Sequence, residues 1–324
     1  MKPKNLWVIL IVLFIFATAL FFVNRSITNL NNLVTEQQVI TLPLTGSAAQ
    51  PEAEISGLAW FGDNLILLPQ YPQIFDETGD GFLFYLPKAE ILAYLDGTNP
   101  NPLKPKSIQL IAPDLLDQIR NYQGFEAIGF SETKVFVTIE AGDGADMQGH
   151  LLSGEIDSLL TSVTLDTANI ALIQPQAVSD NHSDESLLVL EDKVITFYEI
   201  NGEDVVTNPV AHVFDFDLNS LGTIPMSNIE YRLTDTAFVS ENEFWGINYF
   251  FPGDTSLLPS QDPIATEVGE GETHAQYEHV ERLVKFQYTD FGIILADETP
   301  LQLTLIEDAR NWEGLAILDN RGFL

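Results

Sequence analysis

One pattern recurs five times along this chain, and it constrains the fold more than any other feature of the sequence. Each copy begins with an acidic or hydroxyl residue, passes through a polar turn about six to eight residues later, and then enters an apolar strand. In the four complete copies this strand ends fourteen positions after the first residue. The copies begin at Ser56, Glu126, Glu185, Asp235 and Glu313.

The irregular spacing of the copies indicates a constant strand–turn–strand unit joined by loops of different length. Repeats of this kind are typical of β-propellers, and beyond residues 6–23 no long apolar pattern has the period of a helix. We therefore predict an all-β fold, a β-propeller of five or six blades. Short helical turns are expected at residues 88–95 and 114–121, and further strands at 39–44, 281–288 and 301–306. The aromatic residues expected to pack between blades are Trp60, Phe130, Phe136, Phe197, Phe238 and Trp245.

Two copies of the pattern begin and end on glutamate, Glu126 with Glu140 and Glu185 with Glu199. If a three-residue turn joins the two strands, each pair of acids lies directly across a hairpin, where like charges are destabilising. Such pairs are tolerated at a mouth screened by water, or around a cation. Because the inner hairpins of a propeller converge on a central channel, the second possibility predicts a shared Ca²⁺ site, since Ca²⁺ takes six to eight oxygen ligands. Its predicted ligands are Glu126, Glu140, Glu185, Glu199, Asp235 and Glu313.

An acidic, glycine-bearing loop at residues 142–146 directly follows Glu140. This loop could supply ion ligands or a general base, and Asp143 in it and His150 just beyond it are the predicted catalytic residues. A flexible turn is the alternative interpretation. The motifs G-x-S-x-G and G-x-G-x-x-G and a phosphate-binding glycine loop are all absent from the sequence.

The N-terminus predicts a membrane anchor. Lys2 and Lys4 precede an unbroken apolar run of eighteen residues, 6–23, which is just long enough to span a bilayer. The preceding lysines place the N-terminus in the cytoplasm and the rest of the chain outside. The predicted organisation is a signal anchor at 1–23, a polar stalk at 24–37 and the propeller at 38–324. A cleaved signal peptide, with residues 17–19 as the small-x-small site, is the alternative.

The charge of the chain excludes some partners. With 47 acidic against 14 basic residues the net charge is −33, which repels nucleic acid and anionic lipid surfaces. The absence of cysteine excludes disulfides, thiolate zinc sites and thiol nucleophiles. We expect a monomer whose partners are the membrane, through the N-terminal helix, and a small-molecule ester or a cell-envelope polymer.

Three short segments resemble a known family. Residues 55–60 (ISGLAW), 124–128 (GFEAI) and 311–316 (NWEGLA) are similar to segments of the phytase-like, or esterase-like, calcium-dependent extracytoplasmic propellers. The resemblance extends loosely from about residue 50 to the end. It implies a Ca²⁺-dependent hydrolase of esters or phosphoesters; because basic residues are scarce, a phosphorylated substrate would be bridged by the metal. A non-enzymatic binding module is the alternative. The last copy would need residues to about 327, so the final blade is expected to be incomplete.

Overall fold

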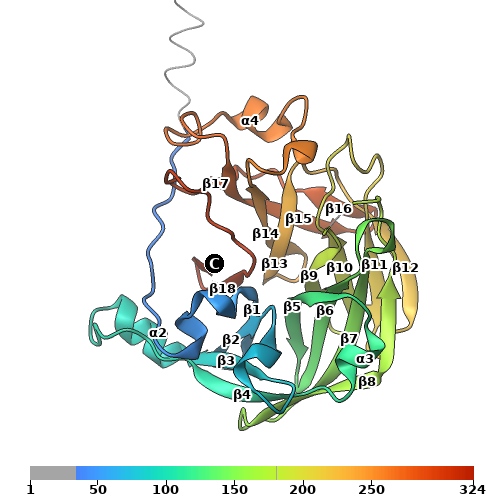
Figure 1. Cartoon of the computed structure of the whole chain (residues 1–324). Coiled ribbons are helices and arrows are strands. Elements are labelled where there is room, and N and C mark those ends of the chain that lie inside the picture. The colour runs from blue at the N-terminus through green and yellow to red at the C-terminus, as the bar shows by residue number, and fades with distance from the viewer. Residues whose placement is uncertain (1–33, 180) are drawn as a thin grey trace, which may run out of the picture.

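The computed structural model describes residues 34–179 and 181–324. Its strands form one sheet of eight strands, one of four, one of five and a final pair, arranged around one axis as the blades of a propeller (Figure 1). The prediction of an all-β propeller is thus confirmed. The inner strands of the five blades contact one another in turn, β1 with β5, then β9, β13 and β18, and β18 returns to β1.

Each blade follows the chain from the inside outward. Blade 1 contains β1 (Ile55–Phe61), β2 (Asn64–Pro69), β3 (Phe82–Pro87) and β4 (Lys106–Ile111). Blade 2 contains β5 (Tyr122–Ser131), β6 (Lys134–Ala141), β7 (Gln148–Ile156) and β8 (Ser162–Ile173). Blade 3 contains β9 (Asp184–Val189), β10 (Lys193–Tyr198), β11 (Val210–Asp215) and β12 (Ser220–Pro225). Blade 4 contains β13 (Arg232–Ser240), β14 (Glu243–Phe250), β15 (Val280–Thr289), β16 (Gly292–Leu295) and the short β17 (Leu301–Gln302). Blade 5 contains β18 (Ala316–Leu318) and β19 (Arg321–Phe323).

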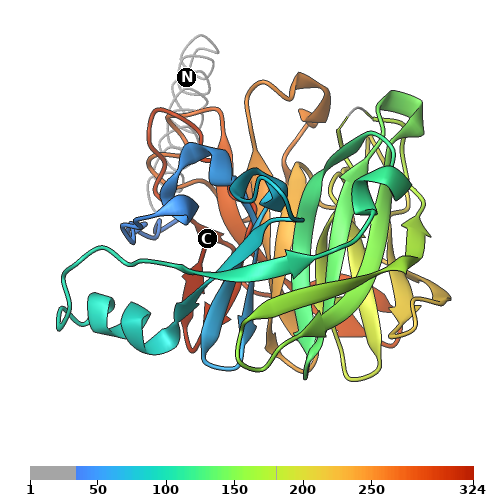
Figure 2. The same ribbon diagram turned by 60° about the horizontal axis from the view of Figure 1, so that its bottom comes forward.

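One contact departs from a simple ring of separate blades. The outer strands β4 and β8 pair in parallel, with Gln109 opposite Ser162, so blades 1 and 2 form a continuous eight-stranded sheet. Figure 2 shows the long outer strands crossing the side of the molecule.

Helices are few and short. They are α2 (Lys88–Leu95), α3 (Leu115–Gln118), α4 (Pro263–Val268) and the 3₁₀ turns η1 (Ser47–Ala49), η2 (Pro51–Ala53), η3 (Pro72–Phe75), η4 (Gly144–Asp146) and η5 (Thr255–Leu257). The helical turn predicted at 88–95 is confirmed, and the one predicted at 114–121 is shorter than expected. α4 lies in the 252–278 insertion, where the Asp262 side chain accepts hydrogen bonds from the amides of Ile264 and Ala265 and so caps its N-terminus.

The hydrophobic core is divided among the interfaces between blades. Separate clusters of buried side chains lie between blades 1 and 2, 2 and 3, 3 and 4, and 4 and 5, and a further cluster packs blade 1 against α2 and the chain end. Phe136, Phe197 and Trp245 are buried in these clusters, and Trp60, Phe130 and Phe238 pack against them. The predicted interblade role of these aromatic residues is confirmed.

The predicted hairpin register is wrong, because the turns contain two residues rather than three. In blade 2, Ser131 pairs with Lys134 across Glu132 and Thr133. In blade 3 the turn is closed by the Leu190 amide, which donates to the Lys193 carbonyl. Two-residue turns are the commonest hairpin connection because their twist matches that of the strands.

The N-terminal segment crosses the outside of the ring instead of adding a strand to a blade. Gln37 forms an isolated bridge with Leu303, and Leu44 forms another with Leu103. The expected strand at 39–44 is therefore reduced to two anchoring points, one on blade 4 and one on blade 1. The expected strand at 301–306 is likewise limited to the two residues of β17.

The predicted membrane helix at 6–23 and most of the predicted stalk lie outside the described residues. Within residues 34–179 and 181–324, no helix has the length and apolar character needed to cross a bilayer.

Candidate functional site

The inner strands share a local irregularity at the first residue of the repeat. The regular pairing shifts around Ser56 in β1, Glu126 in β5, Glu185 in β9 and Asp235 in β13. A β-bulge of this kind re-aims side chains and is common next to functional sites. In these four strands the bulge lies at the leading residue of the repeat, near the axis of the ring.

Because of the bulge, the two acids of a hairpin are not paired across it. Glu140 lies opposite Gly124, and the Glu199 amide donates to the Ser183 carbonyl. The prediction that Glu126 faces Glu140 and Glu185 faces Glu199 in register is therefore wrong at the backbone level. Their carboxylates nevertheless come close enough to shift one another's pKa.

Four carboxylates from blades 2 and 3 gather at the axis, and we call them the axial cluster: Glu126, Glu140, Glu185 and Glu199. Their residues are 5%, 2%, 8% and 0% exposed, respectively. Carboxylates are almost never buried to this extent without partners. These four residues are among the six predicted ligands, and the structure brings their carboxylates together through a register that differs from the predicted one.

Arg232, the first residue of β13, provides a positive charge for the cluster. Its Nη1 lies 2.9 Å from Glu199 Oε1, and its Nε lies 2.9 Å from Asp254 Oδ2. His182 Nε2 is 4.0 Å from Glu199 Oε2. Among the described residues, ion pairs reach only Glu199 of the four axial carboxylates. Glu126 instead accepts a 3.4 Å hydrogen bond from Gln70 Nε2.

Burial and mutual repulsion make the cluster retain protons. Burial first, and then the Glu140 carboxylate, raise the pKa of Glu126 well above its ordinary value. Burial and Glu199 do the same to the pKa of Glu185. Burial raises the pKa of Glu199 to about 8 even though Arg232 acts in the opposite direction. For Arg232, burial would lower the pKa, but Glu199 and Glu185 raise it overall.

Glu313 lies at the mouth of the cluster. Glu313 is only partly buried. Its charge raises the pKa of Glu126, whereas Arg232 acts to lower the pKa of Glu313. Burial still raises the pKa of Glu313 overall. Its Oε1 accepts a hydrogen bond from Asn311 Nδ2. Glu313 is therefore the acid that a ligand entering from this end would meet first.

Asp235, also a predicted ligand, has a structural role. Its Oδ1 accepts from the Thr236 amide at 2.7 Å and its Oδ2 accepts from the Leu315 amide at 2.6 Å. The Leu58 amide also donates to this carboxylate and lowers its pKa, against the larger effect of burial, which raises it. Asp235 thus links the inner strands of blades 4, 5 and 1.

The two predicted catalytic residues lie apart from the cluster. Asp143 is exposed in the loop before η4. His150 lies opposite Ile139 in the β6–β7 pair, so its side chain shares the face of Ile139. Side chains alternate between faces along a strand, and Glu140 therefore projects from the opposite face. Burial lowers the pKa of His150.

The axial cluster is not arranged as a finished metal centre. In the described part of the chain, no three histidine, aspartate or glutamate side chains form a group ready to hold a metal ion. The Ser183 side chain donates to the Glu140 carboxylate and, with Arg232, lowers its pKa, against the larger effect of burial, which raises it. Side-chain rotations would be needed to bring several carboxylates onto one ion.

The two cavities that the structure describes lie elsewhere. One, of about 180 Å³, is lined by residues that include Asp80, Asp117 and Tyr122. The other, of about 70 Å³, lies in the 252–278 insertion beside His279 and Arg282. Neither is lined by an axial carboxylate.

Several residues that organise the site fell outside the repeated pattern. Arg232 is the first residue of β13 and lies three positions before Asp235, so it falls outside the repeated pattern; a basic residue in so acidic a chain is the available signal. Gln70 ends the first copy, at the position that glutamate occupies in the copies that begin at Glu126 and Glu185. The buried Glu281 contacts Arg310 and Trp312, which lie 29 and 31 positions later, and no local pattern reveals such contacts.

The comparisons with known proteins identify no family. No family model matches this chain, and no curated protein matches it, so the resemblance to phytase-like propellers has no support from them. Solved structures similar in shape include a β-fructofuranosidase of Bombyx mori, with 11% identity and a TM-score of 0.39 over 74% of this chain and 49% of that one. An α-L-arabinanase mutant of Cellvibrio cellulosa has 9% identity and a TM-score of 0.41, covering 89% and 86% of the two chains.

A third similar structure is the Nup133 β-propeller domain of Vanderwaltozyma polyspora, with 10% identity and a TM-score of 0.35 over 61% of this chain and 54% of that one. This chain thus spans about half the length of the first and third structures. Similarities of this extent carry no argument about activity, and the function must be inferred from the site itself.

Proposed function

We propose that the axial cluster binds a divalent cation, Ca²⁺, and that the protein is a cation-dependent hydrolase of an ester or phosphoester. In this proposal the chain is anchored in the membrane by residues 6–23 and the propeller lies outside the cytoplasm. The observation that supports the proposal is the burial of four carboxylates against one guanidinium, that of Arg232.

The energetic argument concerns uncompensated charge. Burying an isolated carboxylate is so costly that the group either takes up a proton or finds a cation. Near neutral pH, the raised pKa values show how strongly the cluster attracts protons. A divalent cation competes for the same oxygens, and Ca²⁺ accepts the flexible, oxygen-only coordination that glutamates offer.

The residues of the site have distinct tasks in this proposal. Glu140 and Glu199 would hold the ion, since both carboxylates are buried and Glu199 is fixed by Arg232. Glu126 is oriented by Gln70, and Glu185 completes the cluster. Bound Ca²⁺ would polarise a substrate oxygen and lower the pKa of a water molecule. Glu313, at the mouth, would be a further ligand of the ion.

Calcium titration of the full chain tests the proposal. Isothermal titration calorimetry should give a Kd on the order of 10⁻⁴ M, the range of extracellular calcium modules. Glu140→Gln and Glu199→Gln should abolish the binding heat, while Glu52→Gln, at an exposed position, should leave it unchanged. Hydrolysis of p-nitrophenyl phosphate or acetate should require Ca²⁺. The absence of binding at millimolar Ca²⁺ would overturn the proposal.

A non-enzymatic propeller that binds a partner or an envelope polymer is the second candidate. The observation in its favour is Asp235, a buried carboxylate used entirely to accept backbone amides from neighbouring blades. A fold that already uses one buried acid as a structural pin could use the others in the same way. Calcium binding without turnover of either ester would support this candidate.

A further inference from the structure

The segment that carries Glu313 has no regular secondary structure of its own. Residues 303–315 connect β17 to β18 without a helix or a strand. Such a connection is mobile unless side chains elsewhere hold it. The placement of Glu313 at the mouth of the axial cluster therefore depends on contacts made by the residues on either side of it.

Glu281, on β15, makes the largest share of these contacts. Its Oε1 accepts from the Arg310 amide at 3.0 Å, and its Oε2 accepts from Arg310 Nε at 2.8 Å and from Trp312 Nε1 at 2.6 Å. Arg310 also stacks over the Trp312 ring at 4.9 Å. Glu281 is fully buried, so these charge-assisted bonds are shielded from water.

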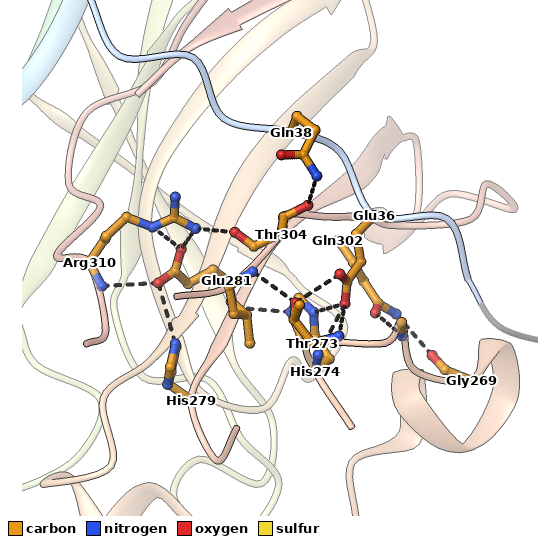
Figure 3. Close-up of polar contacts among 12 residues, drawn as sticks. Glu36, Gln38, Gly269, Thr273, His274, His279, Glu281, Gln302, Thr304 and Arg310 are labelled. Carbon is orange, nitrogen blue, oxygen red and sulfur yellow. Dashed lines mark hydrogen bonds and ion pairs between the residues drawn. The ribbon is translucent and has the colours of Figure 1, made fainter. Parts of the chain in front are cut away.

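Arg310 also contacts the beginning of the same connection. Its Nη2 donates to the Thr304 carbonyl at 2.7 Å and lies 2.6 Å from Glu281 Oε2. Figure 3 shows Arg310 turned toward Glu281 and Thr304, with His279 on the other side of the carboxylate. His279 Nε2 is 3.8 Å from Glu281 Oε1. The carboxylate of Glu281 thus forms the centre of a buried polar network.

Blade 4 fixes the other side of the segment. Thr234 Oγ1 donates to the Trp312 carbonyl at 2.5 Å, and Asp235 holds the Leu315 amide. Gly314 lies against β1, where a Cβ atom would come within 2.7 Å of Leu58 Cγ. Trp312, Gly314 and Leu315 each contact a neighbouring blade, while the Glu313 carboxylate is bonded only by Asn311 among the hydrogen bonds of the described chain.

We infer that Glu281 is a positioning residue that holds Glu313 over the axial cluster by binding Arg310 and Trp312. Glu281 itself would touch neither the ion nor the substrate. This inference rests on the proposed function, because it assigns Glu313 to the ligand-binding end of the same site. It also implies that the site is complete only when residues 303–315 are fixed to blade 4.

Two measurements on Glu281→Gln test the inference. Hydrogen–deuterium exchange of the peptide covering residues 309–316 should become faster, because the amide side chain cannot accept all the donors that the carboxylate accepts. Calcium affinity should fall by about tenfold or more, as when outer partners of metal ligands are removed. Glu272→Gln, at an exposed acid in the 252–278 insertion, is the matched control and should change neither.

A double-mutant cycle separates positioning from a general structural effect. If Glu281 acts through Glu313, the variant carrying both Glu281→Gln and Glu313→Gln should bind Ca²⁺ no more weakly than Glu313→Gln alone. Additive losses would overturn the inference. Trp312→Phe, which removes one donor and keeps the ring, is the milder variant if Glu281→Gln fails to fold, and it should give a smaller loss of affinity.

The outcomes distinguish this inference from the proposed function. If the unmodified protein binds no Ca²⁺, the proposed function fails, and the exchange experiment still decides whether Glu281 fixes the segment. If the protein binds Ca²⁺ and the exchange of residues 309–316 is unchanged in Glu281→Gln, the proposed function stands and the positioning role is wrong.

Discussion

At the scale of single residues, the repeated pattern is explained by how closely the inner strands approach each other. The residue after each leading position is small, and at two of them a Cβ atom would contact the next strand. At Gly57 it would lie 3.3 Å from Ala127 Cα, and at Gly314 it would lie 3.1 Å from the Leu58 nitrogen. The residues at this position are Gly57, Ala127, Ser186, Thr236 and Gly314. Crowding at the axis, rather than chemistry, selects them.

The glycine in the last copy should be irreplaceable for this reason. Gly314→Ala places its new methyl group within 2.7 Å of Leu58 Cγ, so we expect the free energy of unfolding to fall by about 1–3 kcal/mol. Gly322→Ala is the control, because its nearest neighbours are 3.8 Å away. Urea denaturation monitored by fluorescence measures both. Equal stabilities of the two variants would contradict the crowding argument.

Two axial glutamates should respond to the same substitution with opposite signs. Glu199→Gln leaves Arg232 buried with one fewer counter-charge, and we expect a loss of about 3 kcal/mol. Glu126→Gln keeps the acceptor for Gln70 and removes a charge that burial disfavours, so we expect a gain of about 1 kcal/mol at pH 8 in the presence of a chelator. Urea denaturation at pH 8 measures the two changes, and equal signs would contradict this assignment of charges.

At the scale of elements, the bulges of the inner strands explain what the sequence could and could not predict. The alternation of apolar residues was sufficient to locate the hairpins and the small helix at 88–95. It was not sufficient to fix the register, because an added residue in one strand changes pairing without changing the local pattern. Glu126 and Glu185 were therefore grouped correctly, while their partners across the hairpin were not.

The N-terminal segment shows a second limit at this scale, since its position depends on contacts far apart in the sequence. The carboxylate of Glu36 accepts the amides of Thr273 and His274 at 2.9 and 3.0 Å and the Thr273 hydroxyl at 2.8 Å. Figure 3 shows it enclosed by these two residues. Burial would raise the pKa of Glu36, but hydrogen bonds from His274 and Thr273 lower it overall.

Glu36→Gln should loosen this attachment. Hydrogen bonds to a charged acceptor contribute about 1.5–3 kcal/mol, so we expect a loss of stability in that range at pH 7. Because the folded-state pKa of Glu36 is lowered, its contribution is present above the unfolded pKa and is lost as the pH falls through the folded value. The difference between the variant and the parent should therefore shrink in acid. A difference that is constant with pH in denaturation experiments would exclude the ionised carboxylate as the cause.

At the scale of the whole molecule, the fold places its apolar core and its buried charged groups in different regions. Apolar contacts between blades supply the core, whereas the axis collects polar and charged groups. The sequence predicted both parts, because the same repeat carries the apolar strands and the leading acids. Arg232 and the Glu281 network escaped prediction, because their partners are brought together only when the ring is assembled.

The axial cluster makes the stability of the protein depend on pH in a defined direction. The folded pKa values of Glu126, Glu185 and Glu199 lie above the unfolded value near 4.5, so the folded state binds more protons. Without a cation, the contribution of these three glutamates to stability should be greatest below the unfolded pKa. It should then fall by at least about 1 kcal/mol as the pH rises to about 8, the folded pKa of Glu199. Thermal denaturation between pH 5 and 9 in a chelator measures this.

Calcium should reverse the trend if it binds to the cluster, because it stabilises the deprotonated form. The increase in melting temperature on adding Ca²⁺ should therefore be larger at pH 8 than at pH 5. An increase that is independent of pH would place the ion away from the carboxylates of raised pKa.

The parallel pairing of β4 with β8 joins blades 1 and 2 strongly, whereas the ring is weakest at blade 5. Blades 1 and 2 are tied by backbone bonds along their rims, whereas blade 5 consists of two three-residue strands spanned by the N-terminal segment. Mechanical or thermal strain should therefore open the circle beside blade 5 first. Because Glu313 lies beside blade 5, the entrance to the axial cluster should be disrupted before the propeller as a whole unfolds.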